Sequence, residues 1–249
     1  MHFSLDDTIQ IFSDLTNKKN VYKSIFENPT LAYLYELHKE YGIVVSCYVY
    51  LEDETFKLEK TTDVFSSQFS ENAHWLKFGF HARDYKSNYG EKSVLEAKND
   101  YDDCIRELLR ITGNENCIDR VPRLHYFAGN FENSIIMRDT QLGILGLLSA
   151  DDDRDSYWFK RTDNSDYPLD NRDSYTDSQI ELIIFPTDLR METKENFSEK
   201  LENSDDDVLI IFTHEILLED SDIKERIKQS IEYSYKRGYL FDFPMNYVN

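Results

Sequence analysis

The chain opens with the run His2-Phe3-Ser4-Leu5-Asp6-Asp7, in which a short strand-like pattern stops at two adjacent carboxylates. Asn28-Pro29 then begins a helix, since an Asn side chain caps a helix and proline suits the first helical position. Gly42 ends that helix. The β-branched and aromatic run Ile43–Leu51 follows and predicts a buried strand. Strand, helix and strand in this order are typical of a parallel α/β unit.

The same alternation continues to the end of the chain. Further strands are expected at Leu76–Phe80, Arg123–Phe127, Ile144–Leu148, Glu181–Phe185, Val208–Phe212 and Tyr239–Phe243. Further helices are expected at Tyr101–Ile111, Ser134–Gln141 and Asp222–Lys236, and polar loops at Asn88–Asn99 and Asp163–Gln179. About seven or eight strand–helix alternations predict an α/β fold in the form of a distorted (β/α) barrel. No repeat or linker divides the chain, so residues 1–249 are expected to form a single catalytic domain.

The composition excludes some classes of function. The chain carries 48 Asp and Glu against 28 Lys and Arg, a formal net charge of −20. That balance excludes nucleic-acid binding through a broad basic face and disfavours anionic membrane surfaces. The three cysteines have no metal-binding spacing, which indicates reduced thiols. No signal-peptide pattern is visible, so we expect a cytoplasmic protein without nucleic-acid or membrane partners; the oligomeric state stays open.

Polar residues that can do chemistry stand at the ends of the expected strands, where a parallel barrel places its working residues. These ends carry Asp6-Asp7, His81, the segment Arg123–Tyr126, Asp151–Asp153 and His214. A single Asp is most often a solvated loop residue, and a single His is often a hydrogen-bonded core residue. The joint pattern favours a functional site.

In this order the segments resemble the NodB-like polysaccharide deacetylases, carbohydrate esterase family 4. The similar segments are Phe3–Asp7 (the family's T-F-D-D), Asn28–Tyr50 (helix, glycine, buried strand), Gly79–His81 (H-[ST]-x-x-H), Arg123–Tyr126 (R-x-P-Y), Leu148–Trp158 (D-x-D-W), Ile210–His214 (apolar strand ending in His) and Lys236–Phe241 (closing G-Y-x-F). The resemblance covers nearly the whole chain.

The resemblance implies a metal-dependent hydrolase that removes an acetyl group from a saccharide, through an amide C–N bond or an ester. Asp7 and His81 would be ligands of a divalent metal ion, with zinc expected first and cobalt, nickel or manganese as alternatives. Asp6 would act as base and His214 as general acid. Arg123 would keep Asp6 ionised and oriented.

One position departs from the family pattern. The second histidine of the metal motif should follow His81 by four residues, and Tyr85 stands there. Asp84, His125 or water could replace the missing ligand. In a strand, His125 would share a face with Arg123, because side chains alternate with period two. The alternative is an ordinary interior histidine with a hydrogen bond.

Substrate contacts are expected from Tyr126, Asp152 and Trp158, although core packing explains the tryptophan equally well. One Asp of the run after residue 150 is expected near Arg123. The alternating residues Asp188, Arg190 and Glu192 could line a pocket, but we interpret them as a solvated loop. Two rival hypotheses stay open: a catalytically impaired carbohydrate-binding barrel with a metal site eroded at Tyr85, and an interaction protein with an acidic surface.

Overall fold

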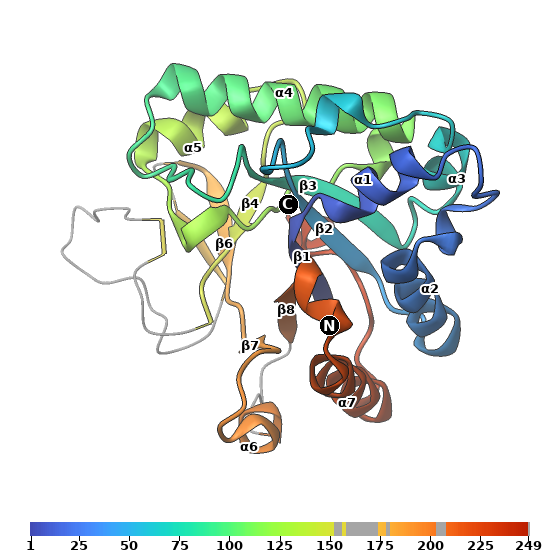
Figure 1. The fold of residues 1–249 in the computed structure, drawn as a ribbon. Coiled ribbons are helices and arrows are strands. Elements are labelled where there is room, and N and C mark those ends of the chain that lie inside the picture. The colour runs from blue at the N-terminus through green and yellow to red at the C-terminus, as the bar shows by residue number, and fades with distance from the viewer. Residues whose placement is uncertain (152–155, 158–173, 178–179, 203–207, 249) are drawn as a thin grey trace.

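The computed structural model describes residues 1–151, 156–157, 174–177, 180–202 and 208–248 (Figure 1). Its larger sheet has five strands in the order β3-β2-β1-β8-β7, and every pair that it contains is parallel. The strands are β1 (His2–Thr8), β2 (Val45–Tyr50), β3 (Leu76–Ala82), β7 (Leu189–Arg190) and β8 (Ile210–His214). Because the pairs are parallel, the carboxyl ends of β1, β3 and β8 lie at one edge of this sheet.

A second sheet continues the curve of the first. It contains β4 (Gly146–Leu148), β6 (Leu182–Phe185) and β5 (Tyr175–Asp177), in the order β4-β6-β5. The extended segment 118–122 joins the two sheets, since it forms a parallel bridge with β3 and hydrogen bonds with residues 145 and 148. In the described residues no strand pair joins the second sheet to β7, so the ring stays open there. The predicted α/β fold is therefore confirmed, as a distorted and incompletely closed barrel.

Helices cover the outside of the sheets (Figure 1). They are α1 (Gln10–Asn17), α2 (Pro29–Tyr41), α3 (Ser66–Glu71), α4 (Val94–Thr112), α5 (Phe131–Arg138), α6 (Phe197–Glu202) and α7 (Ser221–Arg237). The predicted ends of α2 are confirmed: the Asn28 side chain accepts a hydrogen bond from the Leu31 amide (3.0 Å), and Gly42 is left-handed at φ 75°. No helix of the described residues is both long and apolar enough to cross a membrane.

The core lies between the helices and the strands. Every residue of β2 and β3 is buried, as expected for parallel strands that are covered on both faces. Each large apolar side chain buried there contributes about 1.5–3 kcal/mol. The three cysteines are free and buried in the same core. A tightly packed core fixes the strand ends, and with them the functional side chains.

Two predicted strands are wrong. The segment 123–127 is a loop that ends in the 3-10 turn His125–Phe127, with Tyr126 left-handed at φ 59°. The Arg123 carbonyl there accepts a hydrogen bond from His81 instead of joining a strand ladder. Residues 239–243 form an irregular segment before the 3-10 turn Pro244–Tyr247. The Asp242 amide donates to the Met1 carbonyl there (3.2 Å).

Candidate metal centre

The two carboxylates at the end of β1 point to different surroundings. The pairing of β1 with β2 shifts register between Leu5 and Thr8, and Asp7 takes a left-handed backbone with φ 57°. The regular alternation of the strand breaks at this bulge. Asp6 is buried, whereas the Asp7 side chain keeps 30% of its surface exposed. Adjacent carboxylates can therefore take different roles.

His81, at the end of β3, has its proton position set by a backbone group. Its Nδ1 lies 2.5 Å from the Arg123 carbonyl oxygen, which can only accept a hydrogen bond. We assign the ring proton to Nδ1 on this partner. In a neutral His81 the lone pair of Nε2 is then free. Nε2 lies 3.0 Å from Oδ1 of Asp7.

A backbone carbonyl also sets the proton position of His125. Its Nε2 lies 3.0 Å from the Tyr85 carbonyl oxygen and donates to it. Burial, with His81 beside it, lowers the pKa of His125 to about 4, so the ring is neutral at neutral pH. Nδ1 therefore faces His81 Nε2, at 3.1 Å, as an acceptor. The Tyr50 hydroxyl also lies 3.0 Å from Nδ1.

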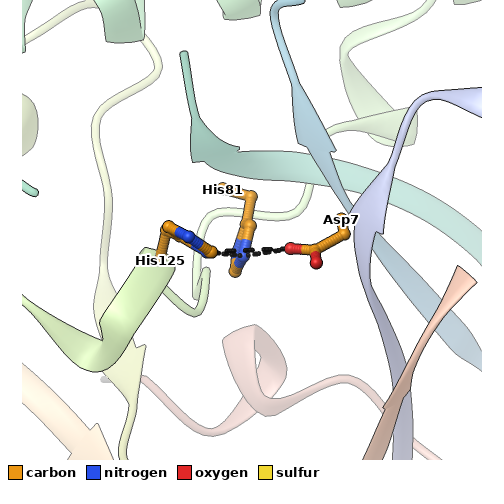
Figure 2. A group of neighbouring side chains, drawn as sticks. All are labelled: Asp7, His81 and His125. Atoms are coloured by element: carbon orange, nitrogen blue, oxygen red, sulfur yellow. Dashed lines mark hydrogen bonds and ion pairs between the residues drawn. The ribbon is translucent and has the colours of Figure 1, made fainter. Parts of the chain in front are cut away.

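Three acceptor atoms thus converge: Asp7 Oδ1, His81 Nε2 and His125 Nδ1, all within 4.8 Å of one another (Figure 2). If His81 carried a proton on both ring nitrogens, its contact with Asp7 would be an ion pair. If the His81 ring is neutral, Asp7 Oδ1 is a buried oxygen that receives no hydrogen bond. Acceptors this close repel one another unless a cation lies between them. One carboxylate and two imidazoles, each imidazole fixed by a carbonyl, are a donor set that fits Zn²⁺ and related divalent ions.

Asp6 belongs to a different network, centred on the buried Arg123. Nη1 of Arg123 donates to Asp6 Oδ1 and Ser4 Oγ, each at 2.9 Å, and Nη2 donates to Thr187 Oγ1 at 3.0 Å. The guanidinium also lies 4.0 Å from the ring centre of Phe212. The charge of each buried partner is thereby compensated, and the Asp6 carboxylate is held in one orientation.

His214, at the end of β8, pairs with Glu192. Its Nδ1 lies 2.7 Å from Glu192 Oε1, which also accepts the Thr213 hydroxyl at 3.0 Å. Burial alone would lower the pKa of His214, but the hydrogen bond to Glu192 and the charges of Asp6 and Asp7 outweigh it, and the pKa is raised. Interpreting Glu192 as a solvated loop residue was therefore wrong. Its partner lies 22 residues further along the chain.

Six of the predicted site residues line one cavity of about 210 Å³, which Asp7 does not line. Its lining includes Asp6, His81, Arg123, His125, Tyr126, Arg190 and His214. Tyr126 stands at the rim with 56% of its surface exposed and donates to the Tyr85 carbonyl. Asp151 pairs with Arg190 (2.9 Å), which also lines the cavity, and the other aspartates of the run after residue 150 lie outside the described residues.

Other predicted residues lie elsewhere. Asp152 and Trp158 lie outside the described residues. Asp84 accepts hydrogen bonds from the Lys86 amide and the Ser87 hydroxyl and so stabilises its own turn. The described residues that form the acceptor cluster do not include it. His125 reaches the cluster from a turn, so its predicted alternation with Arg123 along a strand is wrong.

Sequence reasoning missed Tyr50 and Glu215. Tyr50 ends β2, so the rule that found His81 at a strand end could have found it. Glu215 is buried and accepts three backbone N–H groups from residues 9–11. Its only sequence signal is its place directly after His214, because its partners are more than 200 residues away.

No family model matches the chain, and no curated protein matches its sequence significantly. Solved structures do match. One is a family 4 acetyl xylan esterase from Clostridium thermocellum in complex with a cobalt ion. The match has a TM-score of 0.55 at 13% sequence identity and covers 97% of this chain and 86% of the esterase chain. The Xyl-CE4 domain of a xylanase from the hindgut metagenome of Trinervitermes trinervoides gives 0.54 at 10%, covering 98% and 87%.

A third solved structure, the T48 deacetylase with substrate, has a TM-score of 0.51 at 10% identity and covers 96% of this chain and 85% of its own. Structural similarity at such low sequence identity shows a shared fold only, and the chemistry has to be argued from the residues of the site. The chain has the α/β fold that these carbohydrate esterase family 4 structures share.

Proposed function

We propose that this protein is a metal-dependent hydrolase that removes acetyl groups from a saccharide. The observation that carries the proposal is the convergence of Asp7 Oδ1, His81 Nε2 and His125 Nδ1, with both rings fixed by backbone carbonyls. His125 supplies the third protein ligand in place of the one that Tyr85 replaces. Zinc is the first candidate, and the cobalt ion named with one structural neighbour supports cobalt as a laboratory substitute.

A divalent ion held by these three residues would polarise the acetyl carbonyl and acidify water. Asp6, oriented by Arg123, takes a proton from the attacking water. The oxygen of that water bonds to the carbonyl carbon, and the bond from this carbon to the leaving nitrogen or oxygen breaks. His214, on the same cavity, gives a proton to the leaving atom. The products are acetate and the free amine or hydroxyl of the sugar.

Two observations support an acetylated saccharide as the substrate class. The structural neighbours are described as an acetyl xylan esterase and a deacetylase solved with its substrate. The exposed ring of Tyr126 at the rim offers a flat face of the kind that packs against a sugar ring. The linkage, amide or ester, is decided by assay.

The test combines metal content with acetate release. Protein purified without chelator is analysed for zinc, cobalt, nickel and manganese, with Asp7→Ala as the control for the site. Acetate release from acetylated chitooligosaccharides and acetylated xylan is then compared with that of Asp6→Asn. We expect bound metal that Asp7→Ala loses, and release that Asp6→Asn abolishes. Equal, negligible metal in wild type and variant would overturn the proposal.

The carbohydrate-binding alternative starts from the ligand lost at Tyr85, whereas the position of His125 supports a complete set of three ligands. It is still an outcome of the same test. A protein that binds metal and oligosaccharide, but releases no more acetate than Asp6→Asn, would be a binding barrel rather than an enzyme.

A further inference from the structure

Asp7 holds an uncommon backbone conformation in the bulge of β1, between Asp6, which pairs with His214, and Thr8, which pairs with Val49. Its φ of 57° lies in the left-handed region, which costs a non-glycine residue about 1 kcal/mol or more. Such a conformation persists only when the surrounding structure enforces it. Three residues later the chain enters α1 at Gln10, and the capping position, Ile9, has an apolar side chain that cannot accept a hydrogen bond.

Glu215 supplies the missing cap from the far end of the chain. Its Oε2 accepts the amides of Ile9 (2.7 Å) and Gln10 (2.8 Å), and its Oε1 accepts the amide of Ile11 (2.7 Å). Only 4% of Glu215 is exposed, so water does not compete for these bonds. Burial raises the pKa of Glu215 to about 7, while its three hydrogen bonds from backbone amides favour the ionised form, as does the N-terminus of a helix.

The position of Glu215 connects two parts of the site. It directly follows His214, whose strand pairs with β1 in the register Asp6–His214. Through its side chain it holds the first turn of α1, which begins three residues after Asp7. One residue therefore fastens the ends of the two strands that carry the proposed metal ligand and the proposed acid.

We propose that Glu215 is a positioning residue that holds Asp7 in its strained, ligating conformation. The inference rests on the proposed metal site and goes beyond it, because Glu215 touches no ligand atom. Without the carboxylate, the amides of residues 9–11 lose their acceptor and the bulge at Asp7 relaxes. The Asp7 oxygen then leaves the position that faces His81 and His125.

The test is a Co²⁺ titration followed by visible absorption, which reports both affinity and ligand geometry. Glu215→Gln keeps the shape but replaces one acceptor oxygen with a donor. Asn28→Ala is the matched control, since it also removes a helix cap, at α2 and away from the acceptor cluster. Loss of an outer partner of a metal ligand lowers affinity about 10–100-fold. We expect at least tenfold weaker Co²⁺ binding and an altered spectrum for Glu215→Gln, and wild-type binding for Asn28→Ala.

Equal affinity and spectra for wild type and a folded Glu215→Gln would overturn the positioning role. A wild-type protein that binds no Co²⁺ would instead overturn the metal site itself, so the two failures are distinct. If Glu215→Gln is recovered unfolded, amide hydrogen exchange of the wild type decides. We expect Co²⁺ to slow exchange at Ile9, Gln10 and Ile11; exchange that Co²⁺ leaves unchanged there would contradict the proposal.

Discussion

At the scale of residues, the site depends on proton positions that backbone groups impose. The Arg123 carbonyl holds the proton of His81 on Nδ1, and the Tyr85 carbonyl holds that of His125 on Nε2. Both rings consequently present lone pairs to Asp7. Tyr85, which at first indicated a damaged metal motif, thus contributes through its main chain to the ligand that replaces the expected one.

This arrangement predicts the effect of removing the third ligand. His125→Ala should weaken Co²⁺ binding by more than the roughly 10–100-fold that loss of an outer partner costs, because only two of the three proposed ligands remain. Asp84→Asn tests the alternative ligand, since Asp84 stabilises the turn that carries the Tyr85 carbonyl. Isothermal titration of Co²⁺ into the three proteins measures the difference. Equal affinity of His125→Ala and wild type, or a loss in Asp84→Asn instead, would assign the third ligand elsewhere.

The pairing of His214 with Glu192 predicts a pH dependence. A general acid works only while it is protonated, so activity falls as pH rises through its pKa. Burial lowers the pKa of His214, but the hydrogen bond to Glu192 together with the charges of Asp6, Asp7 and Glu192 outweighs it, and the pKa is raised. Removing the negative charge lowers that pKa again. The basic limb of the kcat/KM profile should therefore lie at lower pH in Glu192→Gln than in wild type. An unchanged basic limb would show that Glu192 does not set the pKa of the general acid.

At the scale of elements, the ends of parallel strands bring the residues of the site together. Helix α2 could be predicted in full because its cap, Asn28, and its stop, Gly42, are local in sequence. The turn that carries His125 could not, since the Arg123 carbonyl takes its partner from β3. Glu192 and Glu215 were missed for the same reason: their partners are close only in the fold. The ends of strands can be predicted from the sequence, whereas contacts between distant segments cannot.

Close packing at β3 yields a prediction for that strand. A Cβ added at Gly79 would lie 3.0 Å from the Asp119 carbonyl oxygen and 3.0 Å from the Tyr48 ring. Gly79→Ala should therefore lower the free energy of unfolding by about 1–3 kcal/mol, as overpacking does. Urea denaturation followed by circular dichroism measures this. A midpoint equal to that of the wild type would show that β3 can move away from its neighbours at no cost.

At the scale of the whole molecule, the net charge of −20 divides into two groups. Among the described residues many acidic side chains are exposed, whereas Asp6, Asp7, Glu192 and Glu215 lie at the carboxyl edge of the sheet. An acidic edge of this kind attracts divalent cations. The cytoplasmic location, the lack of nucleic-acid and membrane partners and the single domain over 1–249 rest on sequence alone and stay predictions.

Metal binding should stabilise the entire fold. A ligand that binds only the folded state adds about 2.7 kcal/mol at a free concentration 100 times its dissociation constant. Zn²⁺ or Co²⁺ should consequently raise the unfolding temperature of the wild type and leave that of Asp7→Ala unchanged. Differential scanning calorimetry, with Mg²⁺ as a control for nonspecific charge screening, measures the shift. An equal shift in both proteins would indicate binding at another place.

The central claim is that Asp7, His81 and His125 together hold one divalent ion. A crystal structure of zinc-loaded protein, with anomalous data collected at the zinc edge, tests it most directly. We predict a single strong anomalous peak among Asp7 Oδ1, His81 Nε2 and His125 Nδ1, at ligand distances of about 2.0–2.2 Å. A peak that excludes His125, or no peak among these three atoms in zinc-saturated crystals, would contradict the account.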